Sequence, residues 1–208
     1  MSIGLLLWLC ASHDDSTSRS LPDASAPLPE RDAATTLTFS RDSLLHTTLL
    51  TRGTDNTVYV IDTNKTQDRT VIRRAYPGNE AAFSEVVRIE RNTLSHDKIT
   101  FQGFPARNVS AWLRRLSFSD PVPPSAEAPR YIWRATHARE IALYTQDDAS
   151  EPIAWFRASS LSEPSPTLSL QPGAYHIQDA IVASLVVVEQ RHRLHSPQGT
   201  IRVSRKPT

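Results

Sequence analysis

Hydrophobic residues in this chain fall mostly in short runs that alternate with polar residues. In Thr57–Asp62, Val58 and Val60 lie on one face of an extended chain, and Tyr59 and Ile61 lie on the other. Such runs, bounded by polar or proline-containing turns, predict β-strands, and we count about nine or ten of them. The predicted strands are Thr36–Ser40, Leu44–Leu50 (a strand or a short turn and strand), Thr57–Asp62, Thr70–Arg74, Phe83–Glu90, Lys98–Gln102, Arg130–Thr136, Glu140–Thr145, Pro152–Ala158 and Thr167–Gln171, with Thr200–Ser204 as a candidate terminal strand. The segment Val109–Leu116 is expected to form one helical turn or two.

One run near the C-terminus breaks this pattern. Every residue from Ala180 to Val188 is apolar except Ser184, and polar residues flank the run on both sides. Its β-branched content favours a strand, whereas its length of roughly 18–20 residues with flanks favours a helix. Asp179 suits the positive end of a helix dipole, and the basic residues that follow the run suit the negative end. We therefore expect a helix over residues 176–193, with core positions Ile177, Ile181, Val182, Leu185, Val186 and Val188.

A helix that is apolar on every side must be surrounded by protein or lie in a membrane. Nine residues span roughly 14 Å, which is far less than a bilayer requires, so no transmembrane span is expected. Because the rest of the chain reads as strands, the natural enclosure is a sheet curled around the helix. The predicted fold is mainly β: a closed or nearly closed antiparallel β-barrel of about 9–12 strands around a central hydrophobic C-terminal helix.

The two ends of the chain are expected to lie outside this domain, which we place at residues 36–194. Residues 1–35 are rich in Ser, Asp, Ala and Pro after a short apolar start, and this composition predicts a disordered lead-in. Residues 195–208 form a C-terminal tail. The apolar stretch Ile3–Ala11 is either the stub of an apolar N-terminus or a misassigned start, or else a short secretion signal that lacks a basic start. A cytoplasmic or peripheral-membrane location is favoured, and secretion is expected if Met1–Ser12 acts as a signal.

Composition narrows the classes of function. Lys and Arg number 23 against 22 Asp and Glu, a balance that argues against nucleic acid as the partner. The single cysteine, Cys10, excludes an intrachain disulfide framework and a cysteine-based zinc site. No glycine-rich phosphate loop, dinucleotide fingerprint or nucleophile-elbow motif occurs. The sequence thus predicts no catalytic residues and no cofactor.

A metal site and a hydrolase site are two further possibilities. His192 and His195 lie three residues apart near the end of the predicted helix, and His176 lies near its start, but no further ligand motif accompanies them. A basic last turn that complements the helix dipole explains them better than a metal site. A hydrolase would require a serine with a histidine and a carboxylate brought together by the fold.

The order of elements resembles a known family. A Tyr-x-Trp strand (Tyr131, Trp133), a hairpin with Ala-Trp-Phe (Ala154–Phe156) and the apolar segment Asp179–Glu189 resemble a fungal, mainly basidiomycete, family of unknown function. That family is grouped with the tubby C-terminal-like superfamily, which includes LURP-one-related proteins and phospholipid scramblases. The resemblance implies a β-barrel threaded by a hydrophobic C-terminal helix. No residue of this chain aligns with the phosphoinositide-binding positions of tubby proteins.

Arginine pairs are the remaining cue to a ligand. Arginine binds phosphate through paired hydrogen bonds, so Arg73, Arg74, Arg114 and Arg115 are candidate contacts for an anionic headgroup. Adjacent strand residues point to opposite faces, so Arg73 and Arg74 cannot both contact one ligand directly. Solvated surface charge is the alternative interpretation of all four. We expect a non-enzymatic binding or scaffold module, with anionic phospholipid as a candidate partner; a protein-interaction or structural module without lipid affinity is the alternative.

Overall fold

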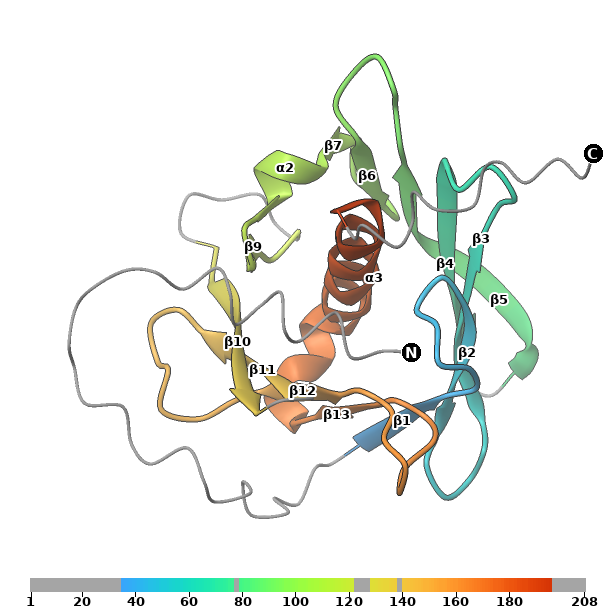
Figure 1. Cartoon of the computed structure of the whole chain (residues 1–208), viewed down its shortest axis with the longest axis vertical. Coiled ribbons are helices and arrows are strands. Elements are labelled where there is room, and N and C mark those ends of the chain that lie inside the picture. The colour runs from blue at the N-terminus through green and yellow to red at the C-terminus, as the bar shows by residue number, and fades with distance from the viewer. Residues whose placement is uncertain (1–34, 77–78, 122–127, 138–139, 196–208) are drawn as a thin grey trace, which may run out of the picture.

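A computed structural model describes residues 35–76, 79–121, 128–137 and 140–195 (Figure 1). They form thirteen strands in one antiparallel sheet, a four-residue helix α2, a 3-10 turn η1 and a long C-terminal helix α3. The first seven strands are β1 Thr35–Phe39, β2 His46–Thr51, β3 Thr57–Thr63, β4 Arg69–Tyr76, β5 Asn79–Glu90, β6 Lys98–Phe101 and β7 Arg107–Asn108. The later elements are α2 Val109–Trp112, β8 Leu113–Arg114, β9 Ser117–Ser119, β10 Arg130–His137, β11 Glu140–Thr145, β12 Ala154–Arg157, β13 Thr167–Leu170, η1 Pro172–Ile177 and α3 Gln178–His195.

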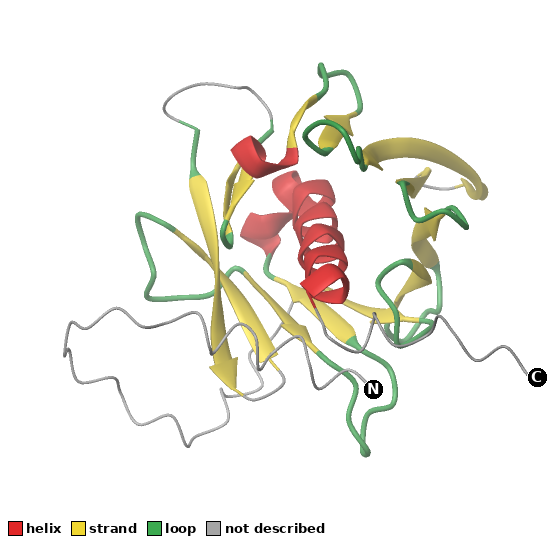
Figure 2. Ribbon diagram, turned by 45° about the horizontal axis from the view of Figure 1, so that its top comes forward, coloured by secondary structure: helices red, strands yellow, loops and turns green. Residues whose placement is uncertain are grey.

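The sheet curls around α3 without closing. Its strand order is β7-β6-β5-β4-β3-β2-β1-β13-β12-β11-β10-β9-β8, and β1 pairs with β13 to join the two halves. Strands lie around α3 in both ribbon views (Figure 1, Figure 2). The edge strands β7 and β8 do not pair with each other; α2 connects them along the chain. The mainly β antiparallel fold with a C-terminal helix is therefore confirmed. A closed barrel is not confirmed, because closure would require β7 and β8 to pair with each other and they do not.

The strand count differs from the expected 9–12 because short strands carry little sequence signal. β7 and β8 have two residues each and β9 has three, too few for an alternating pattern to be recognised. Longer strands such as β3 and β4 follow the expected alternation, whereas β11 is buried at four consecutive positions. In β3, Tyr59, Ile61 and Thr63 are buried while Val58 and Val60 are partly exposed. The inner face of the sheet is thus set by the period of two that the sequence displays.

Helix α3 is enclosed as its composition requires. It begins at Gln178, directly after η1, so the predicted start at residue 176 falls within the 3-10 turn. Each side chain from Ala180 to Val188 is at most 3% exposed. All six predicted core positions, from Ile177 to Val188, are buried. The prediction that this run is a helix covered by protein is confirmed.

Ser184 is the one polar side chain inside the apolar run, and it has two partners. The Trp133 indole Nε1–H on β10 donates to its hydroxyl oxygen at 2.9 Å. The Ser184 hydroxyl in turn donates to the carbonyl of Ile181 at 2.8 Å. Both Ser184 and Trp133 are at most 1% exposed, so neither group can bond to water instead. This pair fixes the rotation of α3 against β10, because another orientation would leave the buried Trp133 N–H without its acceptor.

Aromatic side chains cover the opening between β7 and β8. Trp112 of α2 contacts Phe101 of β6 on one side, with ring centroids 5.1 Å apart, and Phe118 of β9 on the other, at 5.4 Å. Its indole N–H donates to the carbonyl of Ser119 at 3.1 Å. We call this region the seam, defined as β7, α2, β8 and the turn that follows β8. Side-chain packing thus joins the two edges of the sheet where strand hydrogen bonds do not.

Parts of the predicted chain organisation lie outside the described residues. These are the lead-in up to residue 34, the tail from residue 196 and the candidate strand Thr200–Ser204. The region predicted as a helical turn or two, Val109–Leu116, contains the single turn α2 and then β8. Within the described ranges, no helix combines the length and apolar character that a membrane crossing requires.

Replacing Ser184 with Ala tests the buried hydrogen bond. The variant leaves the Trp133 N–H without an acceptor inside the core, which costs about 1–3 kcal/mol of the free energy of unfolding. Urea unfolding followed by tryptophan fluorescence and by circular dichroism measures this loss. Trp133→Phe alone and combined with Ser184→Ala completes a double-mutant cycle. A coupling energy near zero would contradict the role given to this pair.

Candidate anion-binding surface

The four arginines predicted to contact an anion lie in two separate places. Arg73 and Arg74 lie on β4, whereas Arg114 ends β8 and Arg115 follows it. In Figure 1 the strands β4 and β9, the latter being the hairpin partner of β8, lie on opposite sides of α3. The four side chains therefore do not form one site. Each pair has its own surroundings.

Arg74 forms an ion pair at the N-terminal end of α3. It lies on the same face of β4 as the buried Ile72, opposite Tyr59 in the register of β3 and β4, and its side chain is 44% exposed. Its Nη1 lies 3.1 Å from Oδ1 of Asp179. The hydroxyl of Tyr59 donates to the same oxygen at 2.6 Å. Asp179 thus receives two donors from the sheet while it lies in the first turn of α3, where a carboxylate also favours the helix dipole.

Burial and charge shift the proton equilibria of this cluster. Desolvation, followed by the nearby charge of Asp179 and the hydrogen bond to it, raises the pKa of Tyr59 well above its ordinary value. Burial alone would lower the pKa of Arg74, but the charges of Asp179 and Tyr59 outweigh it and raise that pKa. A cation held in this way stabilises the fold and is a poor candidate for binding an outside ligand.

Arg73 has a different environment. It points away from the core, and its cross-strand neighbour on β5 is Glu85. A carboxylate directly opposite an arginine on the outer face of a sheet is the usual arrangement of solvated surface charge. Glu85 itself pairs with Arg88 at 2.8 Å. The structure thus separates Arg73 from Arg74, as the alternation of strand faces predicts.

Arg114 and Arg115 form an exposed basic tip. The register Leu113↔Phe118 and Arg114↔Ser117 makes Arg115 and Leu116 a two-residue hairpin turn. Arg115 has a φ of 57°, which is a conformation that glycine, asparagine or aspartate adopts more readily than arginine. Both side chains are exposed, and no carboxylate of the described residues lies within 4.0 Å of either. Two cations without a carboxylate partner in the described ranges therefore project from a strained turn.

Two further arginines lie at the seam, and sequence reasoning did not assign them to a site. Arg107 of β7 donates from Nη2 to the carbonyl of Pro121 at 3.3 Å, across the seam. Arg191 of α3 donates from Nη1 and Nη2 to the carbonyl of Leu113, both at 3.2 Å. Desolvation lowers the pKa of Arg191, with the charge of Asp97 acting in the opposite direction. Arg107 stands alone in the sequence, and Arg191 is 78 positions from Leu113, so no local pattern joins them to Arg114.

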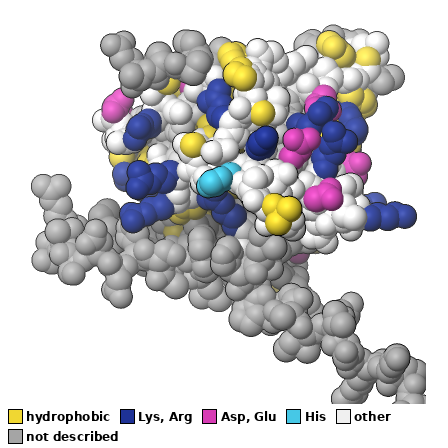
Figure 3. Space-filling view, turned by 90° about the horizontal axis from the view of Figure 1, so that it is seen from above, with side chains coloured by type: hydrophobic (Ala, Val, Ile, Leu, Met, Phe, Trp, Pro, Cys, Tyr) yellow, Lys and Arg dark blue, Asp and Glu magenta, His cyan; other side chains and the backbone are white. Residues whose placement is uncertain are grey.

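We call Arg107, Arg114, Arg115 and Arg191 the basic seam. Figure 3 looks onto the end of the molecule where α2 and β7 lie in Figure 1. On this face the Lys and Arg side chains form separate groups. The group at the left of the view has fewer Asp and Glu beside it than the group at the right. The mixed group is typical of paired surface charge, whereas a group with few acids produces a positive potential that attracts anions.

The candidate metal ligands do not come together in the described side chains. His176 lies 3.2 Å from the hydroxyl of Tyr131, measured from its Nε2, and so has a partner in the fold. The side chains of His192 and His195 lie outside the described set. Among the side chains that are described, no three His, Cys, Asp or Glu residues gather as metal ligands would.

Comparison with known families finds one family model that matches most of the chain. The model of a family of unknown function, DUF6593, matches residues 42–194 of the 208. The chain belongs to this family. The DUF6593 match begins just before β2 and ends in the last turn of α3, so it includes the seam, the Tyr59–Arg74–Asp179 cluster and the Trp133–Ser184 pair. No curated protein and no solved structure matches the chain.

The raised pKa of Tyr59 predicts a pH dependence of stability. The tyrosine of the unfolded chain ionises near pH 10, whereas in the folded protein it keeps its proton to higher pH. The stabilising contribution of Tyr59 is therefore complete below pH 10 and is lost as the pH rises from there through the folded pKa. Urea unfolding between pH 8 and about pH 11 measures this loss.

The Tyr59→Phe variant supplies the control for this measurement. It removes the titrating hydroxyl but keeps the ring, so its free energy of unfolding should fall less steeply above pH 10 than that of the wild type. Tyr131, whose pKa is also raised by burial and by Asp120, contributes equally to both proteins. Parallel curves for the two proteins would contradict the contribution assigned to Tyr59.

Proposed function

We propose that this DUF6593 protein is a non-enzymatic binding module that attaches to anionic phospholipid surfaces through the basic seam. The observation that carries the proposal is the pair Arg114 and Arg115, which is exposed and has no carboxylate partner among the described residues. Arginine matches phosphate oxygens with paired N–H donors, and it gives up its hydration more readily than lysine does. A phosphate-bearing headgroup is thus the ligand chemistry that fits.

The position of the two arginines supports a peripheral mode of binding. A hairpin tip projects from the sheet, so its guanidinium groups can contact a flat membrane surface that the rest of the protein does not reach. Arg191, at the carbonyl of Leu113 beside Arg114, and Arg107, elsewhere in the seam, add positive charge, although both also donate to backbone carbonyls. Attraction between such a tip and anionic lipid falls off over about 10 Å at 0.1 M salt. The module would therefore associate reversibly and respond to ionic strength.

We also propose that the fold is related to the tubby C-terminal-like superfamily. The sheet that curls around an apolar C-terminal helix supports this kinship, as does the Tyr131-x-Trp133 strand that holds Ser184. The open seam is the point of difference from a closed barrel. The fungal origin expected from the same resemblance stays a prediction.

Liposome co-sedimentation tests the lipid proposal. Vesicles of phosphatidylcholine alone, and the same vesicles with phosphatidylserine or phosphoinositide, are compared at low and high ionic strength. The wild type should bind only the anionic vesicles and should dissociate at high salt. The double variant Arg114→Gln, Arg115→Gly should bind about 30-fold more weakly, since each arginine near an anionic surface contributes about 1 kcal/mol.

The matched control removes the same charge elsewhere. Arg41 and Arg52 are exposed in and beside the β1–β2 region, so Arg41→Gln with Arg52→Gln lowers the net charge equally. This control should bind like the wild type. Arg115→Gly should not destabilise the fold, because glycine relieves the positive φ of the turn. Failure of the wild type to bind any anionic vesicle at low salt would overturn the proposal and favour a protein-interaction module.

A further inference from the structure

Within the described part of the chain, strand β5 has a long edge without a partner strand. Its twelve residues pair with β4 from Asn79 to Glu90, but β6 pairs only with Val87–Glu90, and one more bond joins Gln102 N–H to the Val86 carbonyl. On the β6 side, residues 79–85 therefore have no neighbouring strand among the described residues. An open edge of about seven residues is long enough to accept another strand, and proteins seldom leave such an edge uncovered.

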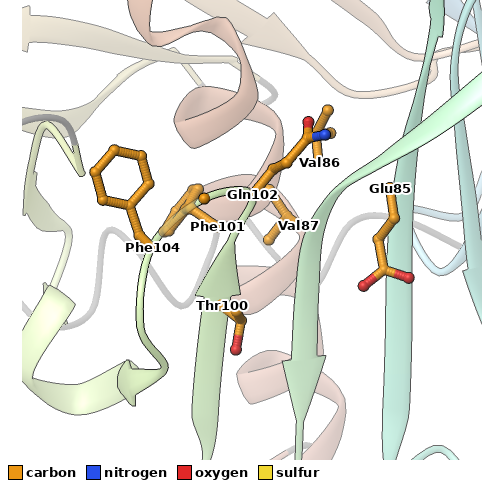
Figure 4. Close-up of a pocket in the computed structure, with 8 residues that line it drawn as sticks. Glu85, Val86, Val87, Thr100, Phe101, Gln102 and Phe104 are labelled. Atoms are coloured by element: carbon orange, nitrogen blue, oxygen red, sulfur yellow. The ribbon is translucent and has the colours of Figure 1, made fainter.

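A pocket lies where this open edge begins. It has a volume of about 360 Å³ and is lined by both strands at the point where β6 leaves β5 (Figure 4). Val86 is the extra residue of a β-bulge, since Ile72 pairs with Val87 and Arg73 with Glu85. Bulges of this type end regular pairing and redirect side chains. The residues that line the pocket are Glu85, Val86, Val87, Thr100, Phe101, Gln102, Gly103 and Phe104, of which Val86, Val87 and Phe101 are almost fully buried.

We propose that the C-terminal segment Thr200–Ser204 of the same chain adds to this edge as a strand. Its sequence alternates in the way that predicts a strand, with Ile201 and Val203 on one face. Strand addition pairs the backbones along the edge and places alternate side chains in pockets. One of the two aliphatic side chains, which lie on the same face of the added strand, fills the pocket between β5 and β6.

Chain length and charge favour this occupant over others. Helix α3 contacts β5 and ends at His195. The four residues between His195 and Thr200 can span about 16 Å when extended. The open part of β5 carries Glu80 and Glu85 and no cation of its own; Glu85 is already paired with Arg88 and lies opposite Arg73. Residues 196–208 carry Arg202, Arg205 and Lys206 and no acid. Because the segment Thr200–Ser204 is tethered to α3, its effective concentration at the edge is high, whereas a free partner has no such advantage.

Hydrogen exchange tests this arrangement in the full chain. The backbone amides of residues 82–85 that face away from β4 should exchange slowly in the wild type. Val203→Pro removes a strand N–H and forces a backbone that cannot pair, so these amides should exchange at least about tenfold faster, a change of about 1.4 kcal/mol. Thr208→Pro places proline beyond the segment and is the matched control. In this variant the amides of residues 82–85 should exchange at the same rate as in the wild type.

Two further measurements distinguish the occupants of the edge. Adding a synthetic peptide of residues 199–206 to the Val203→Pro protein should restore slow exchange at the same amides. Equal exchange in wild type and Val203→Pro would overturn the proposal. Protection that grows with protein concentration and does not depend on Val203 would assign the edge to a second copy of the chain, and this too would overturn it. Neither outcome bears on the lipid proposal, because the edge and the basic seam share no residue.

Discussion

The enclosure of an apolar helix on all sides is the constraint from which the rest of this structure follows. Nine consecutive residues of α3 expose at most 3% of any side chain, so a single sheet must supply neighbours around the whole circumference. A flat sheet covers only one side of a helix. Curling the sheet meets the requirement, and the natural twist of strands assists it. The order of the strands, with β1 paired to β13, brings both halves of the chain to the same helix.

Enclosure alone would allow α3 to rotate or slide, because apolar contacts have little directional preference. Polar contacts at two levels fix its position. Ser184 accepts the indole N–H of Trp133 in the middle, and Asp179 accepts Tyr59 and Arg74 at the start. A further contact lies near the end, where Arg191 donates to the Leu113 carbonyl. The last contact links the helix to the seam, so the part of the sheet that is open is also the part that α3 secures with a cation.

The sequence predicts the main architecture because two periodicities dominate it. Alternation in segments such as TVYVID identifies the strands, and the unbroken run from Ala180 to Val188 identifies the buried helix. The very short strands β7, β8 and β9 could not be predicted, since two or three residues show no period. The pairing of Arg74 with Asp179 spans 105 positions and had no local signal. The separation of Arg73 from Arg74 was predictable from strand geometry, whereas the contact of Arg191 with Leu113, the neighbour of Arg114, depends on the tertiary fold.

Native-state hydrogen exchange of α3 tests the enclosure most directly. A helix covered by sheet on every side can exchange the amides of residues 182–188 only when the whole domain unfolds. The free energy from their exchange should therefore equal the free energy of unfolding measured with urea, and both should fall with denaturant at the same slope. Exchange of these amides with a much smaller free energy, independent of denaturant, would indicate that α3 opens locally and would contradict the account.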